Sequence, residues 1–382
     1  MGKIRVLHII THLPIGGAQD NTLLTVEGLN KDQYDVTLLT GPGGEWLGRA
    51  RQIPDLKVII VPEIVREINL FYDIISIIKI FKIIKKHNYQ IVHTHSSKPG
   101  FSGRIASKLA GVPHIIHTIH GFPFNDYMPR WQQSLYVLLE RCLGRFTQKL
   151  ITVCNLNKEK AIKLCIAPRN KFITIYSGID FSKFHFKGKV DKERLFGISN
   201  SQKIVGMVGR LSKQKAPQIF IDAIPKVLIE FPDTMFLLIG DGELRPQLEL
   251  QIKQLGIENN IVIQGFREDI PQVLSCLDIF VLSSLWEGLG RSLTEAMYMK
   301  CPVVATGVEG VPELVENEVV GLLVEPDDPD AISAGILALL KDASKAKRLA
   351  ENAHSRVAHD FDAEKMVAEI HKLYQDCLAK SK

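Results

Sequence analysis

The sequence lacks the features that mark secreted and membrane-spanning proteins. Its six cysteines form no C-x2-C pair and stand mostly in apolar runs, so we expect reduced core residues rather than disulfides. No stretch reaches the roughly 18 uninterrupted apolar residues of a membrane span. The first apolar run, residues 4–10, is too short for a signal sequence and predicts a strand. We therefore expect a cytoplasmic protein.

A large excess of charge of one sign is also missing. The 47 Lys and Arg against 42 Asp and Glu give a net charge of +5 and a pI near 8.7. This mild basicity favours anionic ligands or an anionic membrane surface, but it is too small to predict nucleic-acid binding. At 382 residues the chain suits two domains of about 150 to 200 residues each.

Short runs rich in Val, Ile and Leu alternate with longer helical patterns, which is typical of parallel sheets wrapped by helices. The fold class predicted is therefore α/β. The predicted strands of the first half are residues 4–10, 34–39, 58–61, 91–93, 114–117, 150–153 and 172–175. Those of the second half are residues 203–208, 235–239, 261–264, 279–282, 302–305 and 321–324.

The strand pattern restarts near Lys203, after a polar stretch over residues 180–191 that predicts a hinge. We predict an N-terminal domain over residues 1–182 and a C-terminal domain over residues 183–360, each a doubly wound, Rossmann-like sheet. Residues 361–382 predict an amphipathic helix that packs back toward the N-terminal domain. Ligands bind beyond the carboxyl ends of such strands, so two facing domains would enclose a cleft.

Candidate site residues of the first half follow its predicted strands. In P-I-G-G-A-Q, Gly16 and Gly17 open a helix and let backbone N–H groups approach an anion; the alternative is a tight turn without a ligand. His120, followed by a glycine in a loop, is a further functional candidate. We interpret His93 and His117 as hydrogen-bonded core residues. No cysteine or carboxylate completes a ligand set with the histidines, so no metal is predicted.

The second half carries groups suited to a diphosphate and to hydroxyls. Arg210 and Lys215 follow a strand, and their charges suit a diphosphate; the alternative is a solvated basic loop. Glu287 lies in a glycine-rich loop and Glu295 in the helix that follows, and carboxylates accept hydrogen bonds from vicinal hydroxyls. The alternative is a purely structural role, in which both glutamates cap the helix and face water. The D-x-D of residues 328–330 is expected to cap a helix rather than bind a metal.

Four motifs, in order and spacing, resemble those of retaining glycosyltransferases of the GT-B type, known as family 4. They are G-R-L-x3-K at residues 209–215, G-D-G-E at 240–243, E-x7-E at 287–295 and G-V-P-E-L-V at 310–315. The resemblance extends over nearly the whole chain. It implies a GT-B fold, with an N-terminal domain on the acceptor side and a C-terminal domain that binds the nucleotide-sugar donor.

The resemblance also implies roles for single residues. Those implied for catalysis are His120, Arg210, Lys215 and Glu287. Those implied for donor binding are Gly16, Gly17, Phe266, Arg267, Gly288, Leu289, Gly290 and Glu295. In this scheme Arg210 and Lys215 hold the diphosphate, Glu287 the transferred sugar and Glu295 the ribose. Ala216 departs from the family pattern, because a glycine usually follows the lysine, and Ser177 and Leu289 replace a usual Asn and a common Phe.

The implied reaction moves a hexose or N-acetylhexosamine from a UDP-sugar to a glycan or lipid-linked acceptor in surface-polysaccharide or glycan biosynthesis. The donor's anomeric configuration is retained through front-face attack and a short-lived ion pair. The acceptor proton passes to a phosphate oxygen, with no cofactor and no metal. Two other classes stay open: a nucleotide-sugar epimerase of similar fold and a non-catalytic nucleotide-sugar binding protein.

Residues 71–86 predict a basic amphipathic helix. Polar residues fall along one stripe of this helix, and apolar residues occupy almost every other position. Such a helix can lie on an anionic leaflet, which predicts a peripheral enzyme at the cytoplasmic membrane face. The alternative is a helix whose apolar side packs on the sheet while its lysines face water. The aromatic stretch over residues 122–131 either meets a lipid-linked acceptor or forms a folded loop.

Overall fold

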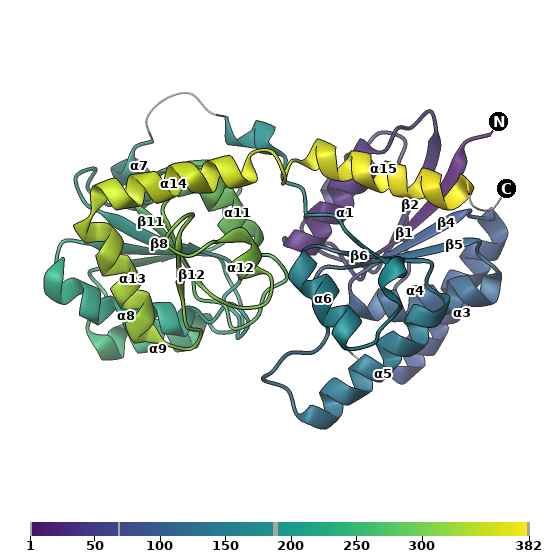
Figure 1. The fold of residues 1–382 in the computed structure, drawn as a ribbon, viewed down its shortest axis with the longest axis horizontal. Coiled ribbons are helices and arrows are strands. Elements are labelled where there is room, and N and C mark those ends of the chain that lie inside the picture. The colour runs from purple at the N-terminus through teal and green to yellow at the C-terminus, as the bar shows by residue number, and fades with distance from the viewer. Residues whose placement is uncertain (1, 68, 186–189, 380–382) are drawn as a thin grey trace. The chain divides into compact units, whose positions relative to one another are not determined.

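The chain forms two α/β units in the computed structural model, which describes residues 2–67, 69–185 and 190–379 (Figure 1). One unit comprises Met1–Ile179 with Ala363–Lys382, and the other comprises Asp180–Asp362. The predicted boundaries, after residues 182 and 360, lie within a few residues of these. Residues 186–189 of the predicted hinge lie outside the described residues.

The first unit is built on a parallel sheet, with seven strands among the described residues in the order β3-β2-β1-β4-β5-β6-β7. The strands are β1 (Ile4–Ile9), β2 (Tyr34–Thr40), β3 (Lys57–Ile60), β4 (Ile91–His95), β5 (His114–Ile119), β6 (Lys149–Thr152) and β7 (Phe172–Thr174). The helices are α1 (Gly17–Gly28), α2 (Leu47–Gln52), α3 (Leu70–His87), α4 (Ser97–Ala110), α5 (Arg130–Phe146), α6 (Asn155–Lys163), η1 (Arg169–Lys171) and α15 (Ala363–Ala379).

The two faces of this sheet are covered by different helices because strand side chains alternate between faces. Val6 and Ile10 share a buried cluster with residues of α1 and α15, whereas Leu7 and Ile9 pack with residues of α3 and α4. Figure 1 shows α15, in yellow, beside α1 in this unit, although some 330 residues of chain separate them, roughly the length of two domains. The amphipathic face of α15 therefore completes the core of the first unit.

The second unit repeats the plan with six parallel strands among the described residues, in the order β10-β9-β8-β11-β12-β13. The strands are β8 (Ile204–Val208), β9 (Met235–Ile239), β10 (Ile261–Gln264), β11 (Ile279–Leu282), β12 (Val303–Thr306) and β13 (Leu322–Val324). The helices are η2 (Phe181–Phe184), α7 (Lys192–Phe196), α8 (Pro217–Glu230), α9 (Arg245–Leu255), α10 (Ile270–Ser275), α11 (Arg291–Tyr298), α12 (Val311–Leu314), α13 (Pro329–Lys341) and α14 (Ala343–Val357).

Each predicted strand is observed, with its ends shifted by no more than two residues. Both sheets are parallel, so the predicted α/β class and the two Rossmann-like sheets are confirmed. The prediction for the cysteines was wrong in part: all six are free, but Cys142 and Cys165 are exposed rather than in the core. Cys142 lies on the exposed side of α5 beside Arg141, and Cys165 lies in the turn after α6 with φ +51°, between the apolar residues Leu164 and Ile166, so apolar neighbours in sequence do not show its exposure.

Candidate functional site

Two loops at the carboxyl edge of the second sheet bring Lys215 and Glu287 together. β8 and β11 are neighbours, so the loops after them meet. Lys215 Nζ lies 2.7 Å from Glu287 Oε2, and their side chains are only 16% and 10% exposed. The Ser284 hydroxyl donates a second hydrogen bond to the same oxygen, at 3.1 Å. The pair therefore sets a cation beside a carboxylate that can accept hydrogen bonds from hydroxyl groups, and both side chains are largely shielded from water.

Buried polar groups hold the two loops in register. The Ser283 hydroxyl lies 3.0 Å from the carbonyl oxygens of both Lys215 and Ala216. The Leu285 amide donates to the Gln214 carbonyl, and the Gln214 side chain donates to the Trp286 carbonyl. Each buried donor thus finds an acceptor in the other loop, which fixes the separation of the two functional side chains.

Two residues at these loop ends have left-handed backbone conformations. Gly290, directly before α11, has φ +92°, a conformation that glycine adopts without strain. Ala216, directly before α8, has φ +47°, which explains why a glycine is the usual residue at this position of the family pattern. The backbone conformation is therefore kept here although the residue differs.

Glu295 lies in α11 and pairs with Arg291 one turn earlier, with 2.8 Å between Arg291 Nε and Glu295 Oε1. Leu289 is buried at 5% exposure, so its side chain packs inward and only its backbone is suited to a ligand. The structure therefore places the residues of the predicted glutamate motif along one loop and the first turns of one helix.

Arg210 follows β8 and is half-buried, and its guanidinium makes no hydrogen bond or ion pair with any described residue. A partly buried, unpaired guanidinium is suited to an anionic ligand. The G-D-G-E motif explains its placement: Leu211 N donates to the Asp241 carbonyl, and a side chain at Gly240 would come within 2.0 Å of the Gly209 carbonyl. The glycine keeps the two loops in contact.

The loop after β10 treats its two predicted residues differently. Phe266 is 51% exposed, which leaves its ring accessible for stacking. Arg267 instead donates to both oxygens of Asp269, at 2.8 and 2.6 Å, and to Gln264 Oε1 at 2.7 Å, and the hydrogen bonds to Asp269 raise the pKa of Arg267. Its guanidinium is thus committed to shaping the loop.

Glu309 is a residue of this site that had no candidate role from sequence. Its carboxylate accepts a hydrogen bond from the Glu287 backbone N–H at 3.1 Å, and its own φ is +43°. A left-handed glutamate just before G-V-P-E-L-V is the signal that could have found it, since a non-glycine residue in that conformation marks a constrained position.

In the first unit, Gly16 and Gly17 lie where α1 begins. Gly16 is extended, and a side chain there would meet the Gln19 carboxamide oxygen at 2.6 Å. The first turn of α1 also holds Asp20, whose negative charge is neutralised by an ion pair with Arg49. This pairing keeps the positive end of the helix available to an anion.

His120 follows β5 and is half-buried, with its Nε2 3.2 Å from His95 Nδ1. Burial lowers the pKa of His120 to about 4, so the ring is neutral at neutral pH. His93 and His117 are buried and hydrogen-bonded, His93 to Tyr374 and Thr118 and His117 to Thr94, which confirms the prediction that they are core residues.

His8 was not a candidate from sequence, but in the structure it joins two other histidines in a cluster that could bind a metal ion. Nitrogens of His8, His93 and His95 all lie within 4.8 Å of one another, close enough for a shared metal ion. The rings of His93 and His95 are stacked at 4.3 Å, however, and a hydrogen bond of 3.0 Å already joins His8 to His95.

The D-x-D motif is a helix cap, as predicted: Asp328 accepts the Ala331 N–H of α13.

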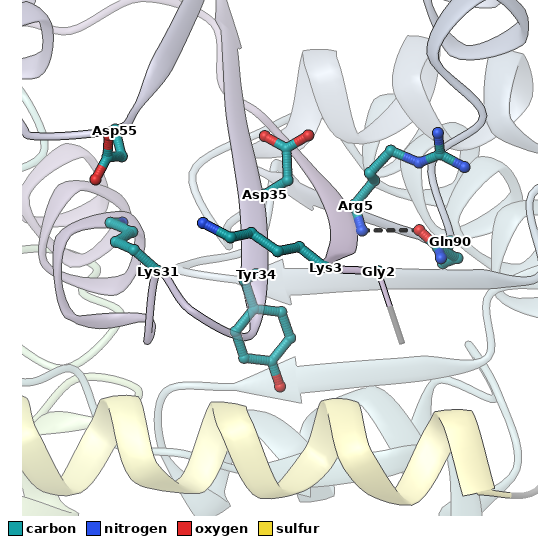
Figure 2. Close-up of a pocket in the computed structure, with 8 residues that line it drawn as sticks. All are labelled: Gly2, Lys3, Arg5, Lys31, Tyr34, Asp35, Asp55 and Gln90. Carbon is teal, nitrogen blue, oxygen red and sulfur yellow. Dashed lines mark hydrogen bonds between the residues drawn. The ribbon is translucent and has the colours of Figure 1, made fainter.

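A hollow of about 600 Å³ lies at the opposite, amino edge of the first sheet (Figure 2). Its charged residues are of both signs, namely Lys3, Arg5, Lys31, Asp35 and Asp55. Because strands β1 and β2 begin here, the hollow is far from the carboxyl ends where Gly16 and His120 lie. It is separate from the predicted site.

Both units match family models of known proteins. The model described as Glycosyltransferase Family 4 matches residues 15–183, and the model described as Glycosyl transferases group 1 matches residues 191–356. A crystal structure of Anabaena Alr3699/HepE in complex with UDP and glucose has the same fold, with a TM-score of 0.84, 24% identity and coverage of 98% of this chain and 100% of that one. Two parallel Rossmann-like sheets of this kind are the architecture of the GT-B fold.

Two curated relatives extend over the full length. The Escherichia coli UDP-Gal:alpha-D-GlcNAc-diphosphoundecaprenol alpha-1,3-galactosyltransferase is 34% identical over 384 residues, covering 98% of this chain and 97% of that protein. The Staphylococcus aureus capsular polysaccharide biosynthesis glycosyltransferase CapM is 25% identical over 389 residues, covering 100% and 99%. The chain belongs to family 4 of the glycosyltransferases, and it is a transferase enzyme.

Proposed function

We propose that this chain transfers galactose from UDP-galactose to an N-acetylglucosamine carried on undecaprenyl diphosphate, forming an α-1,3 linkage in the synthesis of a lipid-linked glycan. The observation that carries the proposal is the full-length similarity, at 34% identity, to an enzyme named for that donor, acceptor and linkage. UDP-galactose is an α-glycosyl phosphate, so an α-linked product means that the configuration at the anomeric carbon is retained.

The second unit supplies the donor chemistry. As the bond between sugar and UDP breaks, negative charge grows on the diphosphate, and Arg210 and Lys215 stabilise it. Glu287 accepts hydrogen bonds from hydroxyls of the galactose, and Glu295 accepts them from the ribose. The exposed ring of Phe266 stacks on the uracil. The unpaired guanidinium of Arg210 and the Lys215–Glu287 pair support these assignments.

The backbone around α11 and the first unit complete the proposal. Backbone N–H groups over residues 288–290 bind sugar or phosphate oxygens, and Gly16 and Gly17 bind phosphate at the start of α1. His120 contacts the transferred sugar, and the acceptor hydroxyl passes its proton to a phosphate oxygen of the leaving UDP. Because Arg210 and Lys215 meet the charge of the diphosphate, we propose that transfer is independent of metal.

The test is transfer by the purified protein to a synthetic N-acetylglucosamine diphosphate lipid from UDP-, GDP- and ADP-sugars, with and without EDTA. We expect UDP-galactose to be the preferred donor, the product to be α-linked by NMR, and the rate to change less than about twofold in EDTA. A β-linked product would contradict retention, and no product from any UDP-sugar would contradict the function. A new sugar nucleotide formed without acceptor would indicate the epimerase instead.

We also propose that α3 places the enzyme on an anionic membrane surface at the cytoplasmic face. The apolar side chains of Leu70, Phe71, Ile74 and Ile78 are 76%, 69%, 50% and 47% exposed. On the same stripe, toward the end of the helix, Lys82 and Lys85 are exposed. An exposed apolar stripe continued by lysines suits the boundary between acyl chains and anionic headgroups.

The polar stripe predicted for this helix is partly turned inward. Ser76 is 2% exposed, Asp73 pairs with Lys98 of α4 at 2.8 Å, and Lys79 pairs with Glu63. Ile80 and Ile84 are buried in the core, and Ile77, Phe81 and Ile83 pack against it while staying partly exposed. The apolar outer side is therefore left without cover within the described unit. No helix among the described residues is both long and apolar enough to span a bilayer.

Replacing Phe71 and Ile74 together by serine is expected to lower partition onto phosphatidylglycerol vesicles at low salt by roughly 10- to 100-fold. Full burial of each side chain would contribute about 1.5–3 kcal/mol, and partial burial at a membrane surface contributes less. Vesicle co-sedimentation measures the partition. The matched control replaces Ile229 and Leu250, which are 82% and 57% exposed on the second unit, and should change little. Equal loss in both variants, or no binding by the original protein, would contradict the proposal.

A further inference from the structure

A chain of hydrogen bonds runs through the interior of the first unit and ends at His120. Its links are Thr118 Oγ1 to His93 Nε2 at 2.7 Å, His93 Nδ1 to Tyr374 OH at 2.6 Å, Tyr374 OH to His8 Nε2 at 3.2 Å, His8 Nδ1 to His95 Nε2 at 3.0 Å, and His95 Nδ1 to His120 Nε2 at 3.2 Å. All members before His120 are at most 3% exposed. The chain therefore joins α15 to a residue of the proposed site.

Each imidazole in the chain is neutral at neutral pH. Burial lowers the pKa of His8 to about 3, and it lowers the pKa of His93 and His95 well below the ordinary value. A neutral imidazole has one N–H donor and one acceptor nitrogen. A ring that accepts a hydrogen bond on one side must therefore donate on the other, so each imidazole passes the direction of donation on to its neighbour.

Two directions carry donation through the whole chain. In a third arrangement His93 and His8 both donate to the Tyr374 oxygen, but the buried Tyr374 hydroxyl hydrogen is then left without an acceptor in the chain, which is unfavourable. If donation runs from Thr118 toward His120, the Thr118 hydroxyl donates to His93, every nitrogen in the chain is satisfied, and His120 carries its proton on Nδ1. If donation runs the other way, the Thr118 oxygen accepts from His93, and its hydroxyl hydrogen has no acceptor among the described residues. A buried hydroxyl without an acceptor is unfavourable, so the first direction prevails.

We propose that Tyr374, acting through His8 and His95, holds His120 in the Nδ1-protonated tautomer and fixes the orientation of its ring. His120 Nε2 is occupied by His95, and Nδ1–H is left as a donor for the ligand. Tyr374, His8 and His95 are positioning residues, and the proposal rests on the proposed function in which His120 contacts the sugar. It gives α15 a role beyond covering the core.

The first measurement is the tautomer of His120 in the free protein, by NMR of histidine labelled with ¹⁵N, assigned by comparison with His120→Gln. We expect a protonated Nδ1 in the original protein and a mixture of tautomers in Tyr374→Phe, which removes one hydroxyl and little volume. Thr118→Val at the far end is a second variant of similar size, and it should also weaken the preference for one tautomer.

Kinetics give the second measurement. Tyr374→Phe is expected to lower kcat about tenfold, the scale for losing an outer partner of a functional histidine, while the KM for the donor changes less than about twofold. The matched control is Tyr34→Phe. The Tyr34 hydroxyl bonds His371 at 2.9 Å and Gln375 at 2.8 Å, and its ring packs on that of Tyr374 at 6.0 Å, but it lies outside the chain. It should leave kcat and the tautomer unchanged.

Three results would overturn the proposal: a bare Nδ1 on His120 in the original protein, an unchanged tautomer in both Tyr374→Phe and Thr118→Val, or one metal ion per chain bound to the buried histidines in elemental analysis. The tautomer is read without substrate. A protein that transfers no sugar would therefore overturn the proposed function while leaving this test intact. An enzyme that transfers sugar but has an unprotonated His120 Nδ1 would overturn this proposal and leave the proposed function standing.

Discussion

Lys215→Ala is expected to lower kcat/KM for sugar transfer by about 10²- to 10³-fold, the loss that follows removal of one preorganised group facing a developing oxyanion. Lys215 is 16% exposed, so its charge lies where water is partly excluded. In the proposed function it therefore stabilises the leaving diphosphate more than a surface lysine could. The substitution also leaves the Glu287 carboxylate with the Ser284 hydroxyl but without the lysine charge that pairs with it. Both effects act against transfer.

The matched control for this prediction is Lys213→Ala. Lys213 belongs to the same loop, two positions earlier, and it is exposed. It should change kcat/KM less than about threefold, because exposed charges are screened by water and salt. If Lys215→Ala keeps more than a tenth of the original kcat/KM, or if Lys213→Ala loses as much, the assignment of Lys215 to the diphosphate fails.

Loss of activity must be separated from loss of folding. Removing one partner of a buried ion pair costs about 3–5 kcal/mol when the other charge stays buried, and this pair is partly exposed, so a smaller loss is expected. Glu287→Gln keeps the size of the side chain and removes only its charge. Urea unfolding of Lys215→Ala, Glu287→Gln and the double variant gives the coupling between the two groups, and activity is compared only where the fold persists.

The strands could be predicted from sequence because buried parallel strands are continuous runs of Val, Ile and Leu. The proximity of Lys215 and Glu287 could be anticipated for a related reason. Both follow strands, and the strands β8 and β11 are neighbours, so residues 72 positions apart reach one edge of the sheet. Residues whose positions depend only on where strands end and on the order of the strands in the sheet can thus be placed from sequence.

Residues whose role depends on side-chain partners were not accessible in the same way. Arg267 is committed to Asp269, and nothing in the motif distinguishes a guanidinium facing a ligand from one that braces a loop. A single histidine in an apolar run, such as His8, is typical of a core residue. Its partner Tyr374 lies 366 positions away on α15, and only the fold brings the two together.

The same buried histidines make the first unit sensitive to acid. Burial lowers the pKa of His8 to about 3, the pKa of His120 to about 4, and the pKa values of His93, His95 and His117 well below the ordinary value. The unfolded chain takes up protons on these residues near pH 6.5, whereas the folded chain does not. Between pH 6.5 and the folded pKa values the unfolded state therefore binds more protons, so stability falls as the pH falls.

The expected size is large. At pH 5 each of the five rings contributes a loss of about 2 kcal/mol relative to neutral pH, and together about 10 kcal/mol, which is comparable to the whole stability of a domain. Above about pH 7.5 these groups give almost no pH dependence, because the rings are then largely neutral in the unfolded chain as well. The measurement is urea unfolding between pH 5 and 7.5, followed by tryptophan fluorescence in a Trp286→Phe variant, because the remaining Trp46 and Trp131 both belong to the first unit.

Two variants identify the source of this dependence. His117→Asn removes one of the five rings, so the slope of unfolding free energy against pH should fall by about a fifth, whatever the substitution does to stability at pH 7.5. His359→Gln removes a ring whose side chain is 85% exposed in the second unit, and it should leave the slope unchanged. A slope that is flat between pH 6.5 and 5, or equal in all three proteins, would mean that the buried rings take up protons in the folded state. The hydrogen-bonded chain would then have to tolerate a charge that its neutral geometry excludes.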